Sequence, residues 1–216
     1  MDRLAVEGGG MNERLRIIGF TLAITIFFGG MVAVVNSLLK ERIQRNRQVA
    51  TQRAILVAFA LANPNKPGTA EMVIADYARY IRESSAPDGT TAFARSDNPA
   101  HRAFLLKGDA YWGPLLGVMA VDAAAQQVLG IAFIDHTETP GLGARIDEPP
   151  FRGQFHGISY AIKASDGRRL AFVAPGTAKK ANQEIDCITG ATETSRAVER
   201  IMNRALDTFI NKAGTP

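Results

Sequence analysis

The chain has 216 residues, of which 46% are hydrophobic and 21% are charged, and these values exclude a wholly disordered protein. Its net charge of +4 is mild and its basic residues cluster after one apolar run, which argues against a nucleic-acid-binding protein. The single cysteine excludes an intrachain disulfide, and the three scattered histidines form no usual metal-binding spacing, so no metal site is expected.

The first predicted element is a membrane-spanning helix over residues 17–39, preceded by an N-terminal tail over residues 1–16. The apolar run reads IIGFTLAITIFFGGMVAVVNSLL and contains no charge. With a rise of about 1.5 Å per residue, it is long enough to cross a hydrocarbon core of about 30 Å. The run lacks a small-residue cleavage site, which favours a retained anchor over a cleaved signal peptide. Basic residues are more numerous after the run than before it, so a bare charge count places the following domain in the cytoplasm.

Residues 40–104 are predicted to form a helical connecting region. A helix is expected from Glu41 to about Leu61, ending before the helix breakers of NPNKPG. A second helix follows Thr69, which is a plausible N-cap, and carries its apolar side chains on one face. Residues 84–101 are rich in Ser, Pro, Gly, Asp and Asn and are predicted to be a loop.

Residues 105–216 are predicted to form one α+β domain. Two apolar runs, Pro114–Asp122 and Gln127–Asp135, read as strands paired across a short connection, and a third strand is expected near Leu170. After Thr192, apolar residues recur at helical spacing and predict an amphipathic helix. The predicted fold class is therefore α+β, with one transmembrane helix followed by a mixed domain on an antiparallel sheet.

A first candidate site is the loop HTETPGLGARI, which directly follows the second of these strands. Pro140 fixes φ, while Gly141 and Gly143 permit positive φ, so the backbone can turn tightly with exposed N–H groups. Glu138 and Thr139 add polar groups. On these residues alone, a tight loop without a ligand is the simpler interpretation. A dinucleotide-binding fingerprint is excluded, because no third glycine and no helix-opening pattern follow.

A second candidate site is the stretch EIDCITGATETSRAVERI, at the start of the last predicted helix. Free N–H groups and the helix dipole favour an anion there, most readily a phosphate. Gly190 and Ala191 leave room for a bulky ligand, and four hydroxyl residues surround them: Thr189, Thr192, Thr194 and Ser195. Ordinary helix capping would need only one such residue. The composition alone leaves capping and ligand binding equally supported.

Together, the two motifs resemble the FMN-binding domain of respiratory flavoproteins. HTETPGLG followed about fifty residues later by DCITGAT, behind one membrane helix, is similar to the NqrC subunit of the sodium-translocating NADH:quinone oxidoreductase and the related RnfG subunit of the Rnf complex. The flavinylation motif of that family is Asp, two variable residues, Ser or Thr, then Gly-Ala-Thr. It fits this sequence at Asp186, Thr189, Gly190, Ala191 and Thr192.

Between these two relatives, the segments AYWGPLLGVMAVD and FRGQFHG look more like the sodium-pump subunit. The chain is shorter than typical members of that subunit family, so the Rnf subunit and a free-standing relative stay open as alternatives.

The resemblance implies a covalent FMN, joined to Thr192 through a phosphoester bond that a flavin transferase forms from FAD. It also implies that Thr189 and Ser195 bond phosphate oxygens, and that Leu142 and Thr139 lie against the isoalloxazine ring. Trp112 is expected to border the ring, although an ordinary core aromatic is the simpler reading of that residue. The expected cofactor-binding residues are Thr192, Thr189, Gly190, Ala191, Ser195, Glu138, Thr139, Gly141, Leu142, Gly143, Asp186 and Trp112. No catalytic residue beyond the flavin is expected.

By the same resemblance, the chain is a single-pass protein of the bacterial inner membrane whose C-terminal domain lies in the periplasm, contrary to the bare charge count. It would act as an electron-transfer subunit of an ion-translocating oxidoreductase complex. Its partners would be the lipid bilayer, other membrane and iron–sulfur or flavin subunits, and the flavin transferase. Two alternatives are an assembly module without a working covalent flavin and a stand-alone extracytoplasmic flavoprotein.

Overall fold

The computed structural model describes residues 10–66, 68–85, 91–163 and 166–213. The chain divides into two units, Met1–Arg47 and Gln48–Pro216. One helix, α1 (Met11–Ala58), forms the described part of the first unit and the beginning of the second. The predicted span and the helix expected after it are therefore one continuous helix. Within the described residues, α1 is the helix that is long and apolar enough to cross a membrane, judged by length and composition.

The second unit contains a five-stranded antiparallel sheet in which every strand pairs with its neighbours in sequence. Its strands are β1 (Ile81–Ser85), β2 (Thr91–Arg95), β3 (His101–Asp109), β4 (Pro114–Asp122) and β5 (Gln127–Asp135). The bounds of β4 and β5 agree with those predicted from the two apolar runs. The predicted α+β class and antiparallel pairing are confirmed.

The prediction that residues 84–101 form a loop is wrong. The described part of this range contains the end of β1, all of β2 and the first residue of β3. In β2 only Phe93 is buried, so the strand lacks the alternating apolar pattern by which a half-buried strand is recognised. Backbone pairing with β1 and β3 on both sides makes it a strand instead. The domain boundary expected after residue 104 falls inside β3.

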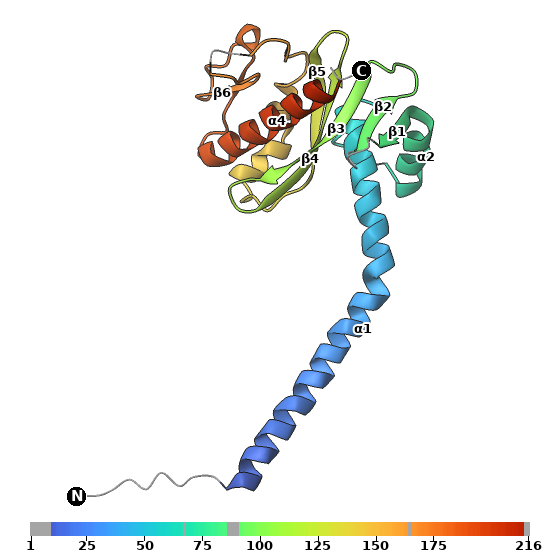
Figure 1. Cartoon of the computed structure of the whole chain (residues 1–216), viewed down its shortest axis with the longest axis vertical. Helices are drawn as coiled ribbons and strands as arrows, with labels where there is room; N and C mark the ends of the chain where they lie inside the picture. The colour runs from blue at the N-terminus through green and yellow to red at the C-terminus, as the bar shows by residue number, and fades with distance from the viewer. Residues whose placement is uncertain (1–9, 67, 86–90, 164–165, 214–216) are drawn as a thin grey trace, which may run out of the picture. The chain divides into compact units, whose positions relative to one another are not determined.

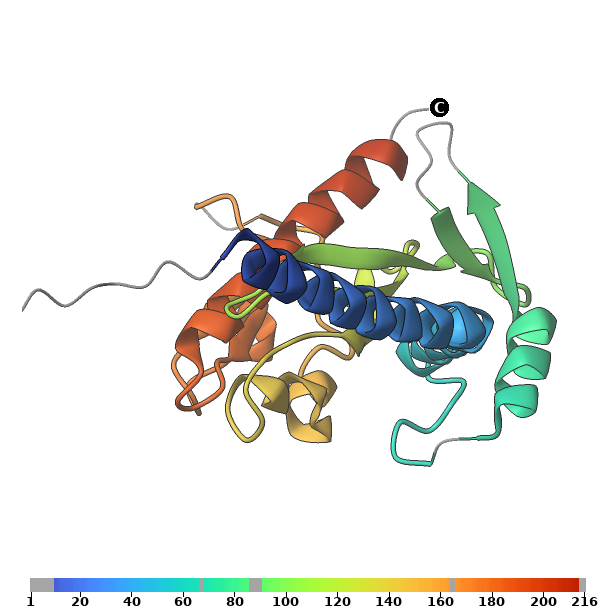
Figure 2. The same cartoon turned by 90° about the horizontal axis from the view of Figure 1, so that it is seen from below.

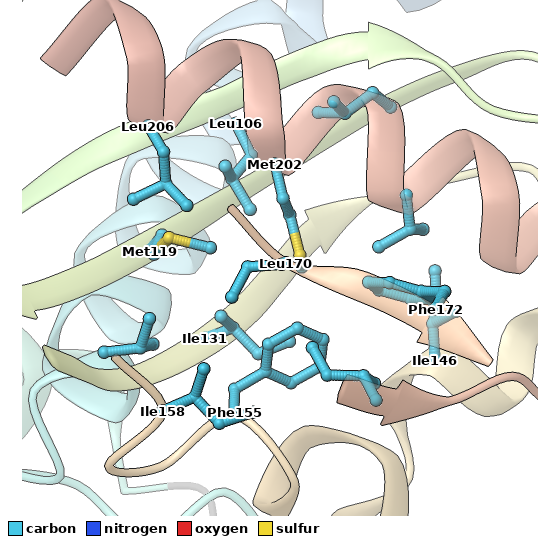
Figure 3. Packing of buried hydrophobic residues seen from close by; sticks show 14 of the residues in the cluster. Leu106, Met119, Ile131, Ile146, Phe155, Ile158, Leu170, Phe172, Met202 and Leu206 are labelled. Atoms are coloured by element: carbon cyan, nitrogen blue, oxygen red, sulfur yellow. The ribbon is translucent and has the colours of Figure 1, made fainter. Parts of the chain in front are cut away.

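One face of the sheet is covered by α4 (Thr192–Ala213), the amphipathic helix expected after Thr192 (Figure 1). It packs directly on β3 at Gly108, where a Cβ atom would lie only 2.6 Å from Ile201 Cγ1. Figure 3 shows Met202 and Leu206 of α4 beside Met119 and Leu106 of the sheet. These fully buried side chains belong to the larger core cluster, which also contains Phe155.

The opposite face is covered by the last turns of α1 and by α2 (Ala70–Tyr80) (Figure 2). The predicted N-cap of α2 is confirmed, because the Thr69 hydroxyl accepts a hydrogen bond from the Met72 amide at 3.4 Å. The end of α1 meets β5 at Gly130, where a Cβ atom would lie 2.7 Å from the carbonyl oxygen of Ala58. The central strands are therefore buried on both faces.

Between β5 and α4 the chain forms short elements that shape the candidate site. They are the 3-10 helix η1 (Gly143–Asp147), α3 (Pro149–Gly153), β6 (Ala171–Val173), the 3-10 helix η2 (Lys180–Asn182) and β7 (Glu184–Asp186). The third strand expected near Leu170 is β6. It does not join the main sheet but pairs in parallel with β7, which leads into the second motif.

Candidate functional site

The hairpin between β3 and β4 ends in two exposed aromatic residues, Tyr111 and Trp112, which we call the aromatic tip. The turn is closed by a hydrogen bond from the Ala110 amide to the Gly113 carbonyl at 2.8 Å. The two rings pack edge to face with centroids 5.0 Å apart, yet 55% of Tyr111 and 63% of Trp112 is exposed. Trp112 is therefore not a core aromatic. Two large apolar side chains at a solvent-facing turn are typical of a binding surface.

The HTETPGLG loop is folded tightly by its own hydrogen bonds. The carbonyl of Thr139 accepts from the amides of Leu142 and Ala144, at 3.1 and 3.0 Å, and Gly141 between them adopts a φ of +74°. His136 supports the start of the loop: its Nε2 lies 2.9 Å from Asp147 Oδ2, and its Nδ1 accepts from the Glu138 amide at 3.3 Å. These internal bonds fix the shape of the loop.

Glu138 turns into the protein instead of facing solvent, and only 5% of it is exposed. Its Oε1 accepts hydrogen bonds from the amides of Tyr111 and Trp112, at 2.9 and 3.0 Å. Its Oε2 accepts from the Thr194 hydroxyl at 2.6 Å. These three contacts, which we call the Glu138 clasp, join the aromatic tip, the HTETPGLG loop and the first turn of α4.

The two glycine-bearing motifs also meet at Leu142 and Gly190. Gly190 has a φ of +79°, and a Cβ atom there would contact Leu142 Cδ2 at 3.4 Å. Leu142 remains half exposed beside this contact. The structure thus brings the predicted residues of both motifs to one region of the surface.

The hydroxyl residues around Gly190 fall into two classes. Thr189 and Thr192 are exposed. Thr194 is buried and bonded to Glu138, and Ser195 is wholly buried: its hydroxyl donates to the Ala191 carbonyl at 2.9 Å and accepts from the Ile188 amide at 3.0 Å. The proton of Ser195 is therefore already used, which leaves it no donor for the phosphate oxygen that the resemblance assigned to it.

The start of α4 has free backbone donors. Within the part of the chain that the structure describes, the amides of Thr192, Glu193 and Thr194 have no hydrogen-bond partner. The preceding residue is Ala191, whose methyl group cannot accept from them as a capping Ser, Thr, Asp or Asn would. Unpaired N–H groups and the helix dipole at this end both favour a bound anion.

Asp186 organises the approach to the second motif. Its Oδ1 accepts from the amides of Thr177 and Ala178, both at 2.9 Å, and its own amide donates to Gln154 Oε1 at 2.7 Å. Asp186 thereby ties β7 to the preceding turn and to the residue after α3. This arrangement gives the expected motif aspartate a structural task beside the site.

Cys187 is expected to react slowly with alkylating reagents. Burial raises the pKa of its thiol. Because the thiolate is the reactive form, its labelling by iodoacetamide at neutral pH should be about tenfold slower than that of an exposed cysteine and should accelerate as pH rises. Mass spectrometry of Ala161→Cys, in which both thiols are present and residue 161 is exposed, measures the two rates together. Equal rates at the two positions would contradict the burial effect.

Comparison with known proteins shows that the region of the candidate site is similar to FMN-binding domains. Residues 110–207 match the family model described as FMN-binding domain. The NqrC subunit of the Na(+)-translocating NADH-quinone reductase from Chlamydia caviae is 33% identical over 120 residues, which are 49% of this chain and 38% of that protein. The same subunit from Pasteurella multocida is 35% identical over 91 residues, covering 42% and 34% of the two chains. The chain thus spans well under half the length of these relatives.

Solved structures extend the similarity of fold beyond the matched domain. The crystal structure of NqrC from Parabacteroides distasonis has a TM-score of 0.69 at 22% identity, covering 82% of this chain and 98% of that one. The Shewanella oneidensis NqrC structure has a TM-score of 0.58 at 18% identity and covers 70% and 88%. The aromatic tip, the HTETPGLG loop and the start of α4 all lie within the matched residues. Residues 110–207 therefore resemble an FMN-binding domain, and the chain is similar to the NqrC subunits of the Na(+)-translocating NADH-quinone reductases.

Proposed function

We propose that the chain is a membrane-anchored electron-transfer subunit that carries FMN covalently on Thr192. FMN supplies the redox chemistry, and the protein supplies its attachment and surroundings. The observation that carries the proposal is the exposed Thr192 hydroxyl at the uncapped start of α4, inside a domain that matches the FMN-binding model. The free amides of this first turn suit a phosphate group attached to that hydroxyl.

The burial of the neighbouring hydroxyls supports Thr192 as the attachment residue. Thr194 and Ser195 are buried and their hydroxyls are bonded internally, so a transferase cannot reach them without local unfolding. Thr189 is exposed but lies before the left-handed turn at Gly190, outside the helix. Thr192 combines exposure with the free amides.

Attachment would proceed by phosphoryl transfer from FAD on a separate transferase. The Thr192 oxygen forms a bond to the FMN phosphorus, the pyrophosphate bond of FAD breaks, AMP leaves and the hydroxyl proton is lost. Thr189 is the remaining exposed hydroxyl of the motif and is available to a phosphate oxygen.

The residues around Thr192 would form the flavin environment. Leu142 lies against Gly190 and presents an apolar side chain, and Thr139 is exposed on the same loop. The aromatic tip is tied to the first turn of α4 through Glu138. These contacts support the proposal that Leu142, Thr139 and Trp112 border the isoalloxazine ring.

The proposed setting is an ion-translocating respiratory complex, with α1 crossing the inner membrane and the flavin domain in the periplasm. The curated relatives described above are NqrC subunits of a sodium-translocating reductase, which supports that complex over an Rnf-type one. Other membrane subunits of the complex would be the partners of the chain, and a flavin transferase would act on it once, during maturation.

The proposal is tested by in-gel fluorescence after denaturing electrophoresis of the chain co-expressed with a flavin transferase. A fluorescent band near 23.3 kDa is expected for the wild type and its complete loss for Thr192→Val. Thr208→Val is the matched control, because Thr208 is an exposed threonine further along α4. Fluorescence retained in Thr192→Val would remove Thr192 from its role. A dark wild-type band, with a transferase shown to label another protein, would instead favour the assembly module.

A further inference from the structure

The aromatic tip is held in place by a buried carboxylate, that of Glu138, which pairs with no cation among the described residues. Glu138 receives three donors, the amides of Tyr111 and Trp112 and the hydroxyl of Thr194. Here the amides of both turn residues donate to the same atom, Glu138 Oε1. A buried charge is tolerated only when hydrogen bonds of this kind replace its hydration.

We propose that Glu138 is a positioning residue of the flavin site, whose carboxylate fixes the aromatic tip relative to the first turn of α4. This inference rests on the proposed attachment of FMN to Thr192. Thr194, which Glu138 holds, is two residues beyond Thr192 on the same turn of the helix. A flavin attached to Thr192 would therefore meet the rings of Tyr111 and Trp112 in one arrangement set by the Glu138 clasp.

The chemistry of the three donors explains why a carboxylate is required. An ionised carboxylate is an acceptor at both oxygens, so it satisfies the two amides and the hydroxyl at once. A glutamine can still accept from the two amides, but its NH₂ group would face the Thr194 hydroxyl, which must then turn its proton elsewhere. Glu138→Gln therefore keeps the tie to the tip, while its NH₂ group becomes the donor to the Thr194 oxygen in the tie to α4. Thr194→Val removes the tie to α4 alone.

Trp112 makes the tip directly observable, because it is the one tryptophan in the chain. In the detergent-solubilised full chain without flavin, fluorescence anisotropy of Trp112 reports motion of the tip. Glu138→Ala is expected to lower this anisotropy, and Glu138→Gln to restore most of it. Glu148→Ala is the matched control, because Glu148 is an exposed glutamate whose side chain pairs with Arg145 and not with the tip.

In the flavin-loaded chain, the readout is the emission and visible circular dichroism of the native flavin. Aromatic rings in contact with a flavin quench it, so Glu138→Ala and Thr194→Val should each raise its emission at least about twofold. The covalent label on a denaturing gel measures how much flavin each variant carries, so emission is compared per attached flavin. Far-ultraviolet circular dichroism checks that each variant is folded.

The outcomes separate this inference from the proposed function. Unchanged anisotropy and unchanged flavin emission in folded Glu138→Ala and Thr194→Val would overturn the positioning role while leaving covalent FMN intact. If Glu138→Ala does not fold, the flavin emission of Thr194→Val decides: a rise supports the positioning role and unchanged emission overturns it. A wild-type chain that takes up no flavin would defeat the proposed function, and with it the flavin part of this inference. The anisotropy experiment would still show whether Glu138 holds the tip.

Discussion

Gly143→Ala is expected to lower the free energy of unfolding of the second unit by about 3 kcal/mol, and to open the Glu138 clasp. A Cβ atom at residue 143 would lie 2.5 Å from Glu138 Oε2 and 2.7 Å from the Thr194 hydroxyl oxygen. Both atoms are buried and bonded to each other, so neither can move without leaving a buried polar group unsatisfied. Urea unfolding of the detergent-solubilised chain, followed by near-ultraviolet circular dichroism, measures the loss.

Gly141→Ala in the same loop is the matched control, because it tests a different property of glycine. Gly141 adopts a φ of +74°, and a Cβ atom there would meet nothing within 4 Å. Its substitution should therefore cost only the strain of the left-handed backbone, about 1 kcal/mol, and leave the anisotropy of Trp112 unchanged. If Gly143→Ala is the milder of the two changes, close packing against Glu138 is not what requires a glycine at 143.

The fold could be predicted from the sequence wherever the apolar pattern was strong and local. β4 and β5 are long apolar runs joined by a short connection, and α4 carries a clear helical stripe, so their types and approximate bounds followed directly. β1, β2 and β3 were missed because much of their strand character comes from pairing with neighbours, and β2 buries one phenylalanine only. The β-propensity of a segment does not indicate which strands it will pair with.

The candidate site was predictable as two motifs but not as an arrangement. The resemblance selected both the HTETPGLG loop and the DCITGAT stretch, and the structure brings Leu142 of one against Gly190 of the other. The clasp was not predicted, because Glu138 bonds residues 27 and 56 positions away in sequence. Only the register of β3 with β4 and the packing of α4 set those distances. An available signal was the placement of two large aromatics before the Gly-Pro pair at residues 113–114, directly before a predicted strand.

Ser195 is a motif residue whose hydroxyl has a structural role, although the resemblance assigned it to the flavin phosphate. Its hydroxyl accepts from Ile188 and donates to Ala191, which closes the backbone turn that presents Thr189 to Thr192. A serine can therefore be needed beside the proposed attachment site for the shape of the backbone alone. Sequence reasoning could not distinguish these roles, because both require a small hydroxyl at the same position.

Phe155→Ala is expected to lower the free energy of unfolding by about 4 kcal/mol, through the lost ring and the cavity left behind. Phe155 is wholly buried, and its ring packs against Phe151 at 5.4 Å and Phe172 at 6.0 Å between centroids. This ring cluster joins the α3 segment to β6, whose partner strand β7 leads into the second motif. Losing this ring cluster should therefore weaken the support of the proposed flavin site as well as the core.

The size of that effect is checked against two substitutions, by the same urea unfolding measurement. Phe155→Leu keeps most of the apolar volume and should lower the free energy of unfolding by about 1 kcal/mol, less than Phe155→Ala does. Ile162→Ala removes an apolar side chain that is 68% exposed and should cost less than about 0.5 kcal/mol. A Phe155→Ala chain no less stable than Ile162→Ala would show that the ring cluster does not hold α3 against β6. The flavin site would then depend on the Glu138 clasp and the Asp186 contacts alone.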